Sequence, residues 1–219
     1  MQMTPLGVAM LKAADWLETK AAIPQSQVGD YSRIRREYIG ELRDAIEGYL
    51  DSGGAVTQWQ NQARRAAVEF MGSAFYSGYA EEGAEETEDE DESWLTGRIA
   101  QEMDFVGGLF QGLREKRGAE GLDVGEESLA RAEGYAATLD AVYQEGKLRG
   151  AKNKMLTWNL GATEKHCVTC SKLDGQRHGA KWWVRKGYKP REPGSQTLEC
   201  RGYECDCSLV DDAGNDFTF

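Results

Sequence analysis

Apolar residues recur every three or four positions along most of the first 150 residues, which is the spacing that puts side chains on one face of an α-helix. The first three stretches with this pattern are residues 4–21, 30–52 and 57–80. Pro24 and then a Gly-Gly pair follow the first two, so each has a helix-ending signal behind it. We therefore predict three amphipathic helices in an N-terminal helical region over residues 1–80.

The same periodicity returns over residues 94–117 and 126–150, with a glycine-rich segment between them. Gly107 and Gly108 lie inside the first of these stretches, where they indicate a kink or a close approach of another helix. A second helical region over residues 93–150 follows from this pattern. The predicted fold is mainly α: a helical body, followed by a small zinc-binding module of short strands and loops.

Residues 81–92 separate the two helical regions and contain nine Asp or Glu. Like charges in a block repel one another, so the pattern favours a solvated acidic loop. We expect this loop to be dispensable for folding, and its deletion to leave the melting temperature nearly unchanged. The alternative is that the acidic run docks on a basic surface, such as the tail of this chain.

All five cysteines lie in the last quarter of the chain, in the pattern Cys-x2-Cys, 29 residues, Cys-x4-Cys-x-Cys. A Cys-x2-Cys pair brings two thiolates to one ion, and the later cluster supplies the rest of a tetrahedral shell. We therefore predict a structural zinc site within a cysteine-rich module over residues 151–219. A disulfide framework, a redox pair at Cys167 and Cys170, and plain core packing are the alternatives.

Five cysteines compete for four places on such an ion. We favour Cys167, Cys170, Cys200 and Cys205 as ligands, with Cys207 as the alternative fourth ligand. The two histidines, His166 and His178, also lie in this stretch and are possible substitutes.

Charge is distributed unevenly along the chain. The net charge is −11, yet residues 151–207 hold eleven Lys and Arg against six Asp and Glu. An acidic body argues against a nucleic-acid-binding protein as a whole, while the basic module leaves a local contact with DNA or an acidic protein open. We see no apolar run long enough to cross a membrane and no secretory signal, and expect synthesis in a reducing cytoplasm.

Catalytic templates are not evident in the sequence. Neither type of glycine-rich phosphate loop appears, nor a Gly-x-Ser-x-Gly elbow. Both histidines fall in the cysteine-rich stretch, without the arrangement of a zinc-bound HNH nuclease. Trp182 and Trp183 lie among Lys181, Arg185 and Lys186, a basic and aromatic patch that suits base stacking or packing against a neighbour.

Spaced elements follow one another from the last predicted helix to the end of the chain: Arg131, Glu133, Gly134 and Tyr135; Leu156 and Trp158; Gly161 and Glu164; Cys167, Cys170, Leu173, Asp174 and Gly175; Pro190, Pro193, Leu198, Cys200 and Gly202; and Cys205, Asp206, Cys207 and Leu209. In this order they resemble the C-terminal part of the phage head morphogenesis, or minor head protein, family, the Mu F-like group. That family often ends in a His-Pro-Asn-Cys-Arg-Cys element. Here Cys200 stands roughly where its histidine would fall, which leaves open whether Cys205 or Cys207 binds.

The resemblance implies a structural minor head protein of a tailed bacteriophage, without enzymatic activity. Such a protein is made in the host cytoplasm and resides in the virion head, in contact with the portal, the major capsid protein or both. A weak contact of the basic module with packaged DNA is compatible with it. The alternatives are a zinc-dependent DNA-binding or nuclease-type protein acting at packaging, and a packaged effector.

Overall fold

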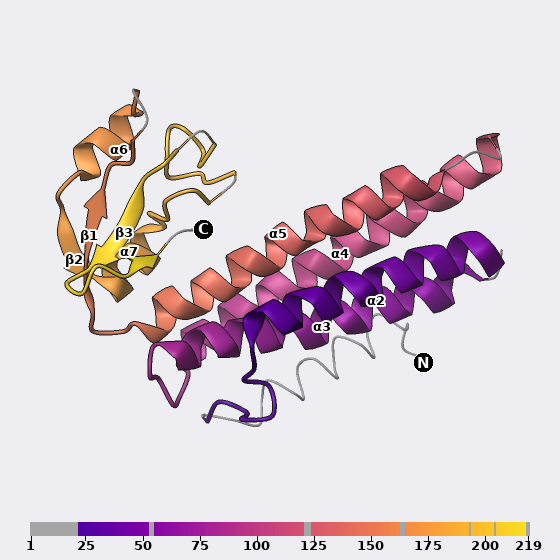
Figure 1. Ribbon diagram of the computed structural model, residues 1–219, viewed down its shortest axis with the longest axis horizontal. Coiled ribbons are helices and arrows are strands. Elements are labelled where there is room, and N and C mark those ends of the chain that lie inside the picture. Colours follow the sequence, from indigo (N-terminus) through magenta and orange to yellow (C-terminus); the bar gives the residue numbers. More distant parts are fainter. Residues whose placement is uncertain are drawn as a thin grey trace.

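The computed structural model describes residues 22–52, 55–120, 124–162, 165–192, 194–203 and 205–217. The helix predicted over residues 4–21 lies outside this part of the chain. Within it, a bundle of long helices carries a small mixed module at one end (Figure 1). The mainly α fold class predicted from the sequence is confirmed, and the last section does contain short strands.

Four long helices form the body: α2 (Tyr31–Ser52), α3 (Val56–Glu81), α4 (Asp89–Glu120) and α5 (Val124–Gly150). They correspond to the periodic stretches of the sequence, because each buries one apolar face against its neighbours. Helix α3 is central and contacts each of the other three. Its buried Phe75 and Tyr79 pack in one core with Tyr38 and Leu42 of α2 and with Phe110 of α4.

Helices α3 and α5 approach closely because glycines line their contact. A Cβ added to Gly146 would lie 2.2 Å from the carbonyl oxygen of Phe75, and one added to Gly78 would lie 2.2 Å from that of Tyr143. Gly107 of α4 is tight as well, since its added Cβ would lie 2.8 Å from the Arg64 guanidinium. Gly107 therefore meets a side chain of α3, whereas an added Cβ at the adjacent Gly108 would have no atom within 4 Å.

The C-terminal module follows α5 directly. Strands β1 (Met155–Asn159), β2 (Arg177–Gly179), β3 (Ser208–Asp211) and β4 (Asp216–Phe217) form an antiparallel sheet in the order β2-β1-β3-β4. The short helices α6 (Val168–Leu173) and α7 (Ala180–Lys186) accompany it. Trp158 and Trp183 fill its core, and the Trp183 indole donates hydrogen bonds to the carbonyls of Leu156 and His178, both at 3.2 Å.

The acidic run of residues 81–92 is a loop only over residues 82–88, and the loop prediction is wrong for residues 89–92. Asp89, Glu90, Asp91 and Glu92 form the first turn of α4, where carboxylates offset the partial positive charge of the helix N-terminus. Asp91 is buried and pairs with Arg149 of α5 at 2.8 Å. The alternative, docking of the acidic run on basic residues of this chain, matches the structure.

Candidate metal centre

Two of the five cysteines are positioned by the start of helix α6. Cys167 is the residue that caps this helix, and its sulfur accepts a hydrogen bond from the backbone N–H of Cys170 at 3.3 Å. One helical turn thus points both sulfurs the same way. This geometry agrees with the sequence-based expectation that a Cys-x2-Cys pair brings two thiolates to one place. The hydrogen bond helps to stabilise a thiolate at Cys167.

The other three cysteines arrive on the segment that leads into β3. Cys200 lies in a turn whose next two residues, Arg201 and Gly202, have positive φ angles of 52° and 73°. A Cβ at Gly202 would lie 1.9 Å from the carbonyl oxygen of Glu192, so only glycine allows the turn to pack this closely. Cys207 immediately precedes β3 and is fully buried.

All five thiols are free and converge on one place. The sulfur of Cys170 lies 3.9 Å from that of Cys200 and 3.8 Å from that of Cys205. Four sulfurs held tetrahedrally at about 2.3 Å from a zinc ion lie about 3.8 Å apart, so these separations suit a shared cation. They are far too long for a disulfide, whose sulfurs lie about 2.05 Å apart.

The sulfurs fall into two groups that share one member. Those of Cys167, Cys170 and Cys200 all lie within 4.8 Å of one another, as do those of Cys170, Cys205 and Cys207. The four favoured ligands are therefore brought to one cluster, and Cys207, the alternative fourth ligand, lies there too. Which of Cys205 and Cys207 binds stays a prediction.

The thiols differ in acidity. Burial acts to raise the pKa of Cys167, but hydrogen bonds with Cys170 and Cys200 outweigh it and hold that pKa below its usual value. For Cys205, hydrogen bonds with Cys207 and Cys170 likewise outweigh burial and lower the pKa. Burial raises the pKa of Cys200 to about 11, and it raises those of Cys170 and Cys207. A bound cation would displace the remaining thiol protons.

The two histidines have different positions. His166 lines a cavity of about 480 Å³ together with Lys165, Tyr203 and the five cysteines. His178 lies on β2, where its ring stacks on Trp182 with the centroids 3.7 Å apart. Of the two candidate substitutes, only His166 is placed at the cysteine cluster.

The basic and aromatic patch of α7 is mostly engaged within the chain. Trp183 is buried, and Trp182 covers His178. Lys181 pairs with Glu88 at 2.5 Å across the junction with the body. Arg185 and Lys186 are exposed, as is Lys181.

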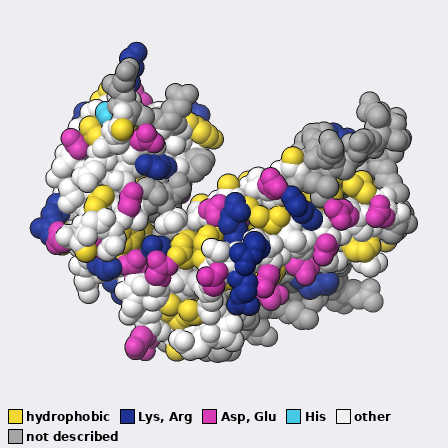
Figure 2. Space-filling view, in the orientation of Figure 1, with side chains coloured by type: hydrophobic (Ala, Val, Ile, Leu, Met, Phe, Trp, Pro, Cys, Tyr) yellow, Lys and Arg dark blue, Asp and Glu magenta, His cyan; other side chains and the backbone are white. Residues whose placement is uncertain are grey.

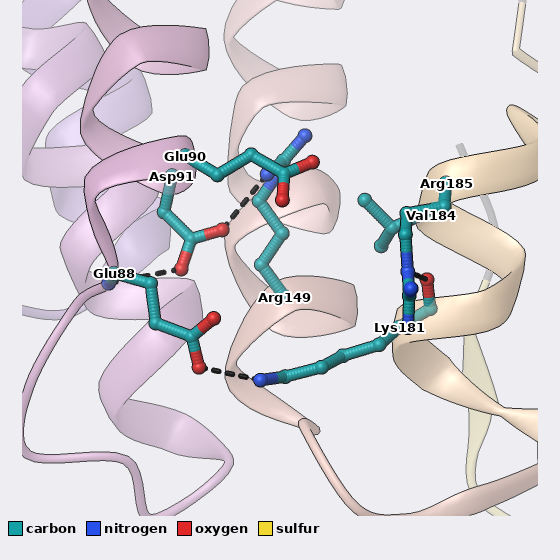
Figure 3. A pocket seen from close by; sticks show the side chains of 7 residues that line it. All are labelled: Glu88, Glu90, Asp91, Arg149, Lys181, Val184 and Arg185. Atoms are coloured by element: carbon teal, nitrogen blue, oxygen red, sulfur yellow. Dashed lines mark hydrogen bonds and ion pairs between the residues drawn. The ribbon is translucent and has the colours of Figure 1, made fainter.

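A second concave site lies at the junction of body and module, with a volume of about 270 Å³. Figure 3 shows that its side chains come from Glu88 just before α4, from the start of α4, from the end of α5 and from α7. Glu88 faces Lys181, and Asp91 faces Arg149. Opposite charges pair across this cleft. Its role in the fold is to hold the two parts together, and no sequence pattern indicated these partners.

Buried charged side chains also lie next to this cleft. Glu145 of α5 lies 2.7 Å from Arg149 and 2.8 Å from Lys189, a residue of the module that is 8% exposed. Arg149 and Lys189 both lie over the ring of Trp94, at 5.1 Å and 5.7 Å from its centroid. Body and module form two lobes in the space-filling view, with charged side chains of both signs spread over the body (Figure 2).

Comparisons with known proteins return no match: no family model, no curated protein and no solved structure is similar to this chain. Within the part that the structure describes, no helix is long and apolar enough to span a bilayer.

Proposed function

We propose that the cysteine cluster binds zinc structurally, and that the module it stabilises is the end piece of a minor head protein of a tailed bacteriophage. The observation that carries the zinc proposal is the convergence of five free thiols at separations that suit a shared cation. Zinc fits this donor set because thiolates are soft ligands and zinc accepts tetrahedral thiolate shells.

The module has few other means of fixing its long connections. The segment from Gly187 to Cys207 contains no helix or strand among its described residues, and it is anchored between α7 and β3. A cation bound by Cys170 of α6 and by Cys200 and Cys205 would tie this segment to the helix that precedes it. Small modules of this kind commonly depend on a metal for their fold.

The phage head proposal rests on the resemblance of the chain from Arg131 to Leu209 to the minor head family. Most of the residues that carry the resemblance lie in the module, whereas Tyr135 on α5 packs against the core of the body. Leu156 and Trp158 lie on β1, Gly175 donates its backbone N–H to the Trp158 carbonyl at 2.9 Å, and Leu209 pairs with Trp158 across the sheet.

The same proposal implies which virion components bind this chain. The portal, the major capsid protein or both bind this chain in the virion head. The module's exposed Arg185 and Lys186 make at most a weak, salt-sensitive contact with packaged DNA, because Lys154, Lys181 and Lys189 face carboxylates of the body at 2.5, 2.5 and 2.8 Å.

The test is co-expression of the full-length chain with the portal and major capsid proteins of its phage, followed by purification of procapsids. We expect the chain to remain with procapsids or portal through gel filtration. A matched preparation lacking the portal distinguishes the two partners. Absence of the chain from both assemblies would overturn the head protein proposal. Sequence-independent DNA binding at 150 mM salt by filter assay would instead favour the packaging alternative.

A further inference from the structure

The cysteine cluster has one thiol more than a closed zinc site uses. A structural zinc takes four protein ligands, and five sulfurs are present. The extra thiol is not remote, because Cys207 belongs to a group with Cys170 and Cys205 in which all sulfurs lie within 4.8 Å of one another. Its role needs an explanation beyond that of a spare.

The five sulfurs form two possible metal sites that share one ligand, the Cys170 sulfur. Cys170 belongs to one group with Cys167 and Cys200 and to a second group with Cys205 and Cys207. A single tetrahedral ion would draw four sulfurs into one group about 3.8 Å apart. Two groups of three that share Cys170 also suit two ions bridged by one thiolate, with the Cys170 sulfur 3.9 Å from Cys200 in one group and 3.8 Å from Cys205 in the other.

We propose that the cluster binds two zinc ions, with Cys170 as a bridging thiolate between them. Cys167 and Cys200 complete the thiolate set of one ion, and Cys205 and Cys207 complete that of the other. This inference rests on the proposed zinc-binding function and deepens it. It makes Cys207 a ligand.

Charge favours the second ion. One zinc with four thiolates carries a net −2 and leaves the fifth sulfur as a buried thiol, whereas two zinc ions with five thiolates carry a net −1. The charge of the nearby Arg191 is partly offset by the Asp206 carboxylate, which lies 3.8 Å from its guanidinium. The same guanidinium donates to the carbonyl oxygens of Asp206 and Cys207 at 3.1 and 3.3 Å. The less charged cluster costs less to hold in a partly buried site.

Each ion would have three thiolates and one remaining position, which zinc fills with water or a further side chain. The cavity around the sulfurs provides room for this, with a volume of about 480 Å³ and His166 on its wall. Two such ions would link α6 to the Cys200 turn and the start of β3, which lie much later in the sequence. The module would then be fixed by one cluster.

The test is the metal content of the full-length protein, loaded with zinc, washed of loosely held metal, and measured by native mass spectrometry and elemental analysis. We expect two zinc ions per chain. One ion per chain would overturn the bridged site while leaving the structural zinc proposal intact. No bound zinc would overturn both.

Variants identify the second ion. We expect Cys207→Ser to lower the content from two ions to one, whereas the neighbouring Ser208→Ala should keep two. An unchanged content in Cys207→Ser would contradict the proposed role of Cys207. If Cys207→Ser does not fold, cadmium-113 NMR of the wild-type protein decides instead: two resonances, both coupled to the Cys170 β-protons, are expected, and a single resonance would overturn the proposal.

Discussion

Glu102 is a carboxyl group in the middle of an apolar helical core. Its side chain is fully buried on α4, and the Tyr38 hydroxyl donates a hydrogen bond to its Oε1 at 3.2 Å. Its Oε2 has no hydrogen-bond partner among the described residues. Burial raises its pKa to about 7, because the charged form loses its hydration there. The folded protein thus holds a proton that the unfolded chain releases at lower pH.

The sign of the resulting pH dependence follows from linkage. Since the folded pKa lies above the unfolded one, stability falls as pH rises from about 4.5 to about 7 and stays reduced above that. We expect Glu102→Gln, which removes this titration, to be more stable than wild type at pH 8 by roughly 2–3 kcal/mol and nearly equal at pH 5. Urea unfolding at both pH values measures this.

The control for that substitution is Asp104→Asn, an exposed position on the same helix. It should change stability by less than about 0.5 kcal/mol at either pH. An equal effect of Glu102→Gln at pH 5 and pH 8 would show that Glu102 does not titrate between them.

Asp91 is the residue at which the acidic run departs from its predicted behaviour. Its partner Arg149 is also buried, and Asp91 further accepts a hydrogen bond from the Tyr79 hydroxyl at 2.9 Å. Removing one member of a buried pair costs about 3 kcal/mol or more. We therefore expect Asp91→Asn to lower the melting temperature by several degrees, measured by circular dichroism, while the exposed neighbour Glu90→Gln leaves it nearly unchanged. Equal melting temperatures for the two variants would restore the solvated-loop interpretation.

Charge patterning could not reveal this burial. Nine acidic residues in twelve look the same whether they face water or a partner, and Arg149 lies 58 positions away in the sequence. The cysteine cluster, in contrast, was predictable, because ligand spacing is itself a local geometric constraint. The position of Cys207 within the cluster depends on how β3 packs, so spacing alone did not place it.

Helices α3 and α5 meet where glycine removes the side chain from the contact. Gly146 faces the Phe75 carbonyl, whereas an added Cβ at Gly134 of the same helix would have no atom within 4 Å. We expect Gly146→Ala to destabilise the protein by about 1–3 kcal/mol through overpacking. Gly134→Ala should be neutral or stabilise it by up to about 1 kcal/mol, because alanine has the higher helix propensity.

Denaturant unfolding of both glycine variants measures the difference. Similar behaviour of the two variants would mean that α3 and α5 are further apart than the glycine contacts indicate.

The two glycines also show what the periodicity of apolar residues can and cannot predict about a helix. Apolar spacing predicted each long helix, since burial of one face is a property of the helix itself. It did not distinguish a glycine at a helix crossing from one facing water, because that depends on the partner helix.

At the scale of the whole molecule, body and module are distinct cores joined by an ionic junction. The bundle core and the module core form separate clusters of buried residues. Lys189 connects them through Glu145, and it lies in the segment between Cys170 and Cys200. Metal binding and attachment of the module to the body therefore act on the same stretch of chain.

Removal of the metal tests this arrangement. In the chelated full-length protein we expect the near-ultraviolet signal of the module to collapse, because Trp158 and Trp183 are buried in the core that the cysteines border. The far-ultraviolet helix signal should persist, since α2 to α5 bury their apolar faces against one another without using the cysteine segment. Limited proteolysis should then cut after Arg177, Lys186 or Arg191 and spare the body.

Restored zinc should reverse these changes. Unaltered spectra after verified zinc removal would show that the metal does not stabilise the module. Complete loss of helix would instead show that the body cannot fold once Lys189 leaves Glu145, and that the two cores are one cooperative unit.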